Sequence, residues 1–213
     1  MPDKEMMVKS LASGWLLLRL DTGPEVSIPE YCHVKFHKSF GGRDVITIQE
    51  GPHANKGASV KTGFLAERRH DARAVVTFYL RSNVLAWQGG PAVKPVNGGG
   101  VSGGLATFTN PSNKVPAGQW DIEMPDFPHD LGRGYQSFAG HAMTWFRIAA
   151  PDSRDRYIHP GTISAGCATV GIRSDKSSAQ GQAALRDYEK LYAYLIARRK
   201  SPGVVGQISV QDF

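Results

Sequence analysis

The residue pair best suited to chemistry in this chain is a cysteine preceded by a histidine. Cys167 follows Gly166 directly, and His159 lies eight residues earlier, at the end of the strand-like run RYIH. A thiol reacts as the thiolate, and a neighbouring imidazole is the usual base that takes its proton. A glycine before the nucleophile lets the backbone approach a substrate closely. The segment predicts a nucleophilic cysteine, His159 as its base, and a thiol more acidic than a free one.

The order of the histidines along the chain limits the alternatives. All seven precede Cys167, which disfavours papain-like hydrolases, whose catalytic histidine follows the cysteine. His141 is the rival base, and His129 stands in a polar, turn-like segment that predicts a solvated side chain. The alternative for Cys167 itself is an unreactive buried residue, because free cysteine is among the most buried residue types.

A second cysteine invites a metal interpretation. Cys32 stands next to His33 and near His37, and these residue types bind zinc. The alternation in residues 31–38 predicts a half-buried strand that directs Cys32 to the opposite face from both histidines. Two cysteines are also too few for a disulfide framework or a cysteine-rich zinc site. We therefore expect neither a metal nor a cofactor.

Composition and charge describe an ordinary globular chain with a basic surface. The 213 residues are 41% hydrophobic and carry a net charge of +6. This charge favours polyanionic surroundings such as anionic cell-wall polymers, but the basic residues are scattered and do not predict nucleic-acid binding. The apolar run at residues 15–18 is too short to span a bilayer and has no cleavage site after it, so we expect no membrane span and no signal peptide.

The elements that must position these residues are mostly strands. Short β-forming runs bounded by glycine and proline recur throughout, and residues 182–199 alone show helical spacing, with Leu185, Tyr188, Leu191, Tyr192 and Leu195 on one face. Residues 201–203, Ser-Pro-Gly, end that helix. We predict a mainly β, β-rich α+β fold with one packed C-terminal helix, divided into a small β-rich N-terminal region, 1–70, and a catalytic domain, 74–213.

Several of these segments resemble the L,D-transpeptidase (YkuD-type) catalytic domain. The run RYIHPGTISAGCATVG is similar to that family's His…Ser-x-Gly-Cys motif, and VTFYLRSNVLAWQGGPAV and VPAGQWDI are similar to its opening strands. The resemblance extends over residues 75–210, with a short histidine-to-cysteine loop as in compact effector and phage-type variants. It implies a β-sandwich or barrel in which Ser164 and Gly166 belong to the catalytic motif. The backbone carbonyl of Ser164 would then orient the histidine.

The resemblance also implies a reaction and a setting. Cys167 would attack a stem peptide of peptidoglycan to form a thioester, with the oxyanion held by backbone amides of residues 165–167. The thioester would be resolved by an amine or by water, as a transpeptidase or carboxypeptidase. Such an enzyme acts in the periplasm or cell wall, so a chain without a signal peptide would be delivered by a secretion system or by lysis. We expect a type VI effector toxin with a secretion carrier and a cognate immunity protein. The alternatives are a phage-type or other cysteine hydrolase, endopeptidase or amidase, and a non-catalytic binding module.

Overall fold

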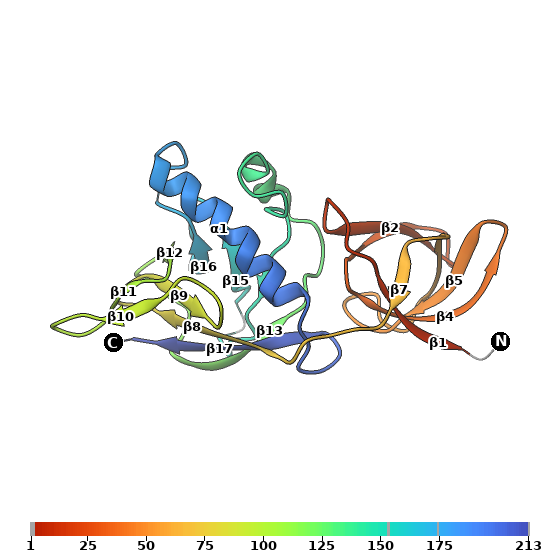
Figure 1. Cartoon of the computed structure of the whole chain (residues 1–213), viewed down its shortest axis with the longest axis horizontal. Helices are drawn as coiled ribbons and strands as arrows, with labels where there is room; N and C mark the ends of the chain where they lie inside the picture. Colours follow the sequence, from red (N-terminus) through yellow and green to blue (C-terminus); the bar gives the residue numbers. More distant parts are fainter. Residues whose placement is uncertain (1–2, 153, 174, 213) are drawn as a thin grey trace.

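The protein is mainly β, with a single α-helix in the part of the chain that the structure describes (Figure 1). A computed structural model describes residues 3–152, 154–173 and 175–212. The strands form two large sheets, and the helix packs on the second. The chain passes from the first sheet to the second between Glu67 and Ala74.

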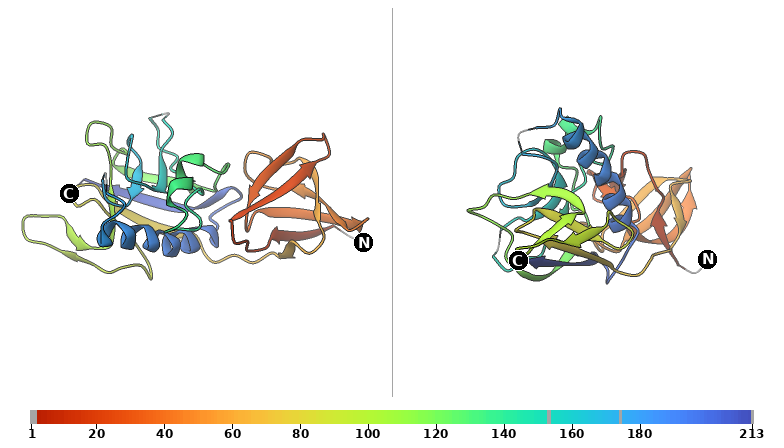
Figure 2. Two further views of the ribbon diagram at one scale, coloured as in Figure 1. Left: turned by 90° about the horizontal axis from the view of Figure 1, so that it is seen from above. Right: turned by 60° about the vertical axis from the view of Figure 1, so that its left-hand side comes forward.

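The first sheet has seven antiparallel strands that curl towards a barrel (Figure 2). Their order across the sheet is β3-β2-β6-β5-β4-β1-β7. Alternation along the strands builds the interior: in β2, Leu16, Leu18 and Leu20 are buried, whereas Leu17 and Arg19 are exposed. The strands are β1 (Lys4–Val8), β2 (Trp15–Leu20), β3 (Glu25–Pro29), β4 (His33–Phe40), β5 (Arg43–Ile48), β6 (Gly57–Lys61) and β7 (Leu65–Glu67).

The second sheet has eight strands in the order β13-β17-β8-β9-β12-β16-β15-β14. Two neighbouring pairs are parallel, β17 with β8 and β15 with β16, and the other pairs are antiparallel. A separate two-stranded ribbon, β10 (Val93–Pro95) with β11 (Val101–Gly103), projects beside it. The eight strands are β8 (Ala74–Tyr79), β9 (Val84–Trp87), β12 (Leu105–Phe108), β13 (Gly118–Glu123), β14 (Phe146–Arg147), β15 (Tyr157–Pro160), β16 (Ala168–Val170) and β17 (Val204–Gln211).

The helix α1 (Ala179–Ile196) lies across the second sheet and packs on β12, β15, β16 and β17 (Figure 1). The apolar positions that predicted it are all buried. It begins three residues earlier than predicted, because the Ser178 side chain caps its N-terminus by accepting a hydrogen bond from the Gly181 amide at 3.0 Å. It also ends three residues earlier than predicted, at Ile196 and before the Ser-Pro-Gly segment. A short 3-10 helix, η1 (Asp130–Tyr135), precedes β14.

Polar contacts join the two sheets. Glu50, after β5, is fully buried and forms an ion pair with Arg199, just beyond α1, at 3.0 Å. The Glu50 carboxylate also accepts hydrogen bonds from the amides of His33 and Gly203. Glu30 accepts a hydrogen bond from the hydroxyl of Tyr192 on α1 at 2.7 Å. The first sheet is therefore docked against the helix and the end of the second sheet.

This junction corrects the predicted half-buried strand at residues 31–38. Cys32 and Val34 are buried as alternation predicts, but His33 is buried as well, with its ring 4.0 Å from that of His70. The strand begins only at His33, and it lies between the barrel interior and the junction. Both faces of the strand are therefore buried at this end. Sequence alternation predicted burial of the face that carries Cys32 but could not predict burial of the face that carries His33.

Candidate functional site

The register between β15 and β16 places the predicted nucleophile and base together. These strands are parallel, with Ile158 opposite Ala168 and His159 opposite Thr169. Thr169 lies opposite His159, and Cys167 stands two residues before Thr169, so alternation along the strand directs the Cys167 side chain to the same face of the sheet as His159. Parallel pairing of the two strands that flank a short loop thus brings imidazole and thiol to one place.

Cys167 and His159 share a cavity of about 400 Å³. Its other walls come from η1, from the segment before β14, and from the loop between β15 and β16. The mouth carries two strongly exposed apolar side chains, Leu131 and Ile163, each 79% exposed. The thiol and the imidazole lie deep, at 8% and 6% exposure. The cavity is lined by Leu131, Tyr135, Trp145, His159, Pro160, Gly161, Ile163, Ala165 and Cys167.

The hydrogen bonds of His159 define its tautomer. Nδ1 lies 3.0 Å from the carbonyl oxygen of Pro160, which can only accept, so Nδ1 carries the proton. Nε2 is then the basic nitrogen, and it accepts from the Thr169 hydroxyl at 3.1 Å. No hydrogen bond joins His159 to Cys167, although the structure describes both residues. Hydrogen bonds therefore fix both nitrogens of the imidazole, and neither nitrogen bonds to the thiol.

An aromatic stack fixes the plane of this imidazole. The Trp145 ring lies 4.2 Å from His159 on one side and 4.2 Å from His129 on the other, and both contacts are stacked. The His129 side chain is only 10% exposed and bonds to Asp126 at 3.0 Å, so the prediction of a solvated His129 is wrong. The polar sequence around it concealed the burial, which comes from Trp145 and Tyr157 in the folded state.

Burial favours the neutral forms of both His159 and Cys167. Burial lowers the pKa of His159 to about 4, against a smaller opposing effect of the Pro160 carbonyl. Burial also raises the pKa of Cys167, although the Tyr157 backbone and the Arg156 charge act in the other direction. The expectation of an unusually acidic thiol is therefore wrong for this state. The apolar walls of the cavity disfavour a charge on either group. The two side chains are not hydrogen-bonded to each other, so an ion pair between them does not offset this cost.

Ser164 supports the turn that precedes Cys167, but not in the predicted way. Its hydroxyl oxygen accepts from the amides of Cys167, at 3.1 Å, and Gly166, at 3.3 Å, and it donates to the Cys167 carbonyl at 3.2 Å. The imidazole bonds to Pro160 and not to the Ser164 carbonyl. Two of the amides expected to bind an oxyanion are thus satisfied by Ser164 in this structure.

A buried arginine that the sequence analysis did not single out holds this turn from behind. Arg156 donates to the Gly166 carbonyl at 2.8 Å and to the Asn113 carbonyl at 2.7 Å, and it forms an ion pair with Asp152 at 2.6 Å. Gly166 has a φ of +131°, and a Cβ there would collide with the Arg156 guanidinium and the Asn113 carbonyl. The glycine is required for the turn. The signal for Arg156 was its position at the start of the strand that carries His159.

His141 is placed elsewhere. Its ring stacks on Tyr192 of α1 at 4.0 Å, and its Nδ1 bonds to Glu189 at 2.6 Å. Burial lowers the pKa of His141, but the Glu189 carboxylate outweighs it and raises the pKa overall. The residue lies against Gly14, at the junction of the two sheets, and does not line the cavity that contains Cys167. The structure brings His159, and not His141, to the thiol.

The cysteine of the first sheet is inert in its setting. Burial raises the pKa of Cys32 far above its ordinary range, and its thiol faces the carbonyls of His33 and Glu50. Among the described residues, no group of three or more His, Cys, Asp or Glu side chains is arranged to hold a metal ion.

Within residues 3–152, 154–173 and 175–212, no helix has both the length and the apolar character needed to cross a membrane.

Comparison of the chain with protein-family models, with curated proteins and with solved structures found no match.

Proposed function

We propose that this protein is a cysteine enzyme that acts on peptidoglycan stem peptides through a thioester on Cys167. The observation that carries the proposal is the convergence of Cys167 and His159 in one cavity, on neighbouring strands, with the imidazole oriented by Pro160, Thr169 and Trp145. The resemblance of residues 156–171 to the L,D-transpeptidase motif supplies the substrate class.

The proposed reaction uses the neutral pair directly. On substrate binding, His159 Nε2 leaves Thr169 and takes the thiol proton, and the Cys167 sulfur attacks the carbonyl of the third stem residue. The imidazolium then protonates the departing amine of the terminal D-alanine. Water resolves the thioester in carboxypeptidation, and an amine resolves it in transpeptidation. The Gly166 and Cys167 amides donate hydrogen bonds to the oxyanion after they release the Ser164 hydroxyl.

The cavity shape suits an extended peptide. Leu131, Tyr135 and Ile163 supply apolar walls around the thiol, and apolar walls with a few polar groups are typical of small-ligand sites. Action on the wall would place the protein in the periplasm, delivered by a secretion system or by lysis. A carrier and an immunity protein are the corresponding partners of an effector toxin.

Mass spectrometry of digested sacculi tests the proposal. Purified sacculi incubated with the full chain should yield stem tripeptides from tetrapeptides, or amine-exchanged products when a D-amino acid is added. Cys167→Ala should abolish these products, whereas Cys32→Ala, which changes a buried thiol outside the cavity, should retain them. Release of whole peptides from the sugar would instead indicate an amidase, and full activity of Cys167→Ala would exclude the thioester.

Three properties of the thiol favour a second candidate, a non-catalytic binding module. The thiol is 8% exposed, its pKa is raised, and it is not hydrogen-bonded to His159. Titration of the native protein with a thiol reagent in the presence of stem peptides separates the two. A module would leave Cys167 unreactive under all conditions, whereas the enzyme would form a mass adduct with a stem-peptide thioester.

A further inference from the structure

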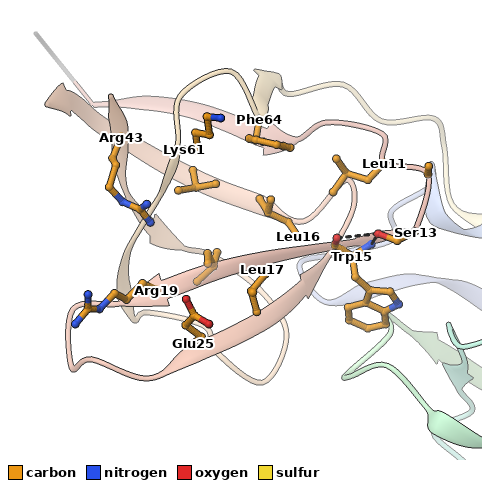
Figure 3. A pocket seen from close by; sticks show the side chains of 13 residues that line it. Leu11, Ser13, Trp15, Leu16, Leu17, Arg19, Glu25, Arg43, Lys61 and Phe64 are labelled. Atoms are coloured by element: carbon orange, nitrogen blue, oxygen red, sulfur yellow. Dashed lines mark hydrogen bonds between the residues drawn. The ribbon is translucent and has the colours of Figure 1, made fainter. Parts of the chain in front are cut away.

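A groove of about 510 Å³, larger than the cavity at Cys167, opens in the first sheet where two neighbouring strands separate (Figure 3). Strand β2 pairs with β3 from Trp15 to Arg19, but it pairs with β6 only at Arg19 and Leu20. Beyond Arg19, towards Trp15, β2 and β6 diverge. Residues of both strands line the opening between them.

The diverging part of β2 presents unpaired backbone groups to this groove. The Leu20 amide donates to Pro24 on the β3 side, and the Asp21 amide donates to Gly57 on the β6 side. Backbone groups alternate in direction along an antiparallel strand, so the N–H and C=O of Leu17 point towards β6. Extension of the Arg19–Ser59 register would pair Leu17 with Lys61, and the structure, which describes both residues, does not form that pair.

The opposite side of the groove offers the matching edge. The Thr62 amide donates to Gly42 on the β5 side, so the backbone groups of Lys61 point towards β2. At its far end the free edge of β2 is closed, because the Ser13 hydroxyl bonds to both the amide and the carbonyl of Trp15. The groove therefore has two short strand edges that face each other, with a defined end.

Apolar side chains line the inner face of the groove, and charged side chains lie on its outer face. Leu16, Leu18 and Val60 are buried on its inner face. Figure 3 shows Arg43 and Lys61 on one side and Arg19 on the other, with Leu17, 59% exposed, between Arg19 and the Trp15 end. Arg43 and Lys61 are directly opposite in the β5–β6 register, which places them on one face. Three cations against Glu25 make the rim net positive.

We propose that this groove binds an extended, acidic polypeptide segment of a partner protein, added as a strand between β2 and β6. Unpaired strand edges attract main-chain pairing, and alternate side chains of an added strand point to opposite faces. Apolar side chains of the segment would meet Leu16 and Val60 on the inner face. Its carboxylates would meet Arg19, Arg43 and Lys61 on the outer face. This site is independent of the chemistry at Cys167.

Fluorescence anisotropy with labelled eight-residue peptides tests the inference on the full chain. The probe alternates Val and Glu. The matched probes are a Val–Lys peptide and a Val–Glu peptide with N-methyl groups on alternate residues, which keeps the charge but removes main-chain donors. The Val–Glu peptide should bind, and both the Lys exchange and N-methylation should weaken binding at least tenfold.

Variants locate the binding site. Arg19→Glu with Lys61→Glu should weaken the Val–Glu peptide at least tenfold, whereas Lys94→Glu, an exposed change on the β10–β11 ribbon, should leave affinity unchanged. Circular dichroism of each variant verifies folding. Equal binding of the N-methylated peptide, no effect of the double variant, or preferential binding of chondroitin sulfate, an anionic polymer without a peptide backbone, would each overturn the proposal. The activity of Cys167 on sacculi is not part of this test.

Discussion

The Thr169 hydroxyl donates a hydrogen bond to Nε2 of His159, so this nitrogen is not available to the thiol. This contact affects the reactivity that we expect of Cys167. Nε2 accepts from the Thr169 hydroxyl and the thiol is buried without an imidazole partner. Many cysteine enzymes rest as an ion pair, but here both groups are neutral because the cavity walls are apolar. In the proposed reaction, activation of the thiol would therefore require that substrate binding bring Nε2 to the thiol.

The first prediction concerns the thiol alone. Because burial raises the pKa of Cys167, its alkylation by iodoacetamide at pH 7 should be at least tenfold slower than that of free cysteine and should accelerate as pH rises above 9. Stopped-time mass spectrometry of the intact protein measures the rate. Rapid alkylation at pH 6 would show that the thiolate is already formed at rest.

The second prediction assigns the base. His159→Ala should abolish turnover of stem peptides because it removes Nε2. It should also lower the melting temperature, because it leaves a cavity beside Trp145 and the Thr169 hydroxyl without its acceptor, so turnover is measured at temperatures where the variant is folded. His141→Ala should destabilise the junction through the loss of its contacts with Glu189 and Tyr192, and should retain turnover at temperatures where it is folded. Turnover by His159→Ala, or its loss in folded His141→Ala, would transfer the role of base to His141.

The third prediction concerns the turn before the nucleophile. Gly166→Ala should abolish activity and destabilise the fold by about 2–4 kcal/mol, since it combines a positive φ with a collision against the Arg156 guanidinium. Gly140→Ala is the matched control, because an added Cβ at Gly140 meets nothing within 4 Å. Urea unfolding of both variants measures the difference. Similar stabilities would show that the turn relaxes without cost.

At the scale of elements, the turn between β5 and β6 and the residues just beyond α1 are joined by a buried ion pair. The Arg199 guanidinium binds both oxygens of Glu50 and the carbonyl of Tyr31, and the remaining lone pairs of Glu50 accept from backbone amides. A charge pair so fully satisfied fixes one relative position of the two sheets, because a displaced pair would leave a buried charge unmatched.

The fourth prediction follows from this pair. Glu50→Gln should cost about 3–5 kcal/mol of unfolding free energy, because it leaves the Arg199 charge buried without its partner. Arg199→Lys should not restore native stability, since an ammonium cannot reproduce the forked contacts. Lys4→Gln, at an exposed ion pair with Glu67, is the control and should change stability by less than about 1 kcal/mol. A small effect of Glu50→Gln would mean that the junction does not depend on charge.

At the scale of the whole molecule, buried histidines link stability to pH. Burial lowers the pKa of both His33 and His159 to about 4, well below the value in an unfolded chain. His33 faces Glu50, His70, Arg68 and Arg199, and of these only Glu50 favours its charged form. Between pH 6.5 and 4 the unfolded chain therefore binds more protons than the folded one.

The fifth prediction is that unfolding free energy falls as pH drops from 6.5 to 4, by on the order of 2–3 kcal/mol for each of these two histidines. Urea denaturation at pH 7.0, 5.5 and 4.5 measures the slope. His33→Gln should flatten the slope by removing one titrating group, whereas Lys94→Gln, an exposed change on the β10–β11 ribbon, should not. A stability that is constant over this range would contradict burial of neutral imidazoles.

The amino-acid sequence by itself determined the class of fold and the helix, and it located the segment that we propose to be reactive. Spacing of apolar residues reports which side of a helix or strand is covered, so the five apolar positions of α1 could be read directly. Cys167, Gly166 and His159 lie within a stretch of nine residues, and a short loop between two strands leaves few ways to arrange them. Residues close in the chain are constrained before the fold is complete.

Only the tertiary structure decided the features that depend on contacts between distant segments. His129 and His33 became buried through Trp145, His70 and Glu50, none of which local pattern could assign to them. The parallel register of β15 and β16 showed that His159, and not His141, is the neighbour of the thiol. The neutral state of the pair came from the apolar cavity around it, since a pKa depends on the surrounding dielectric and charges, which many distant residues together supply.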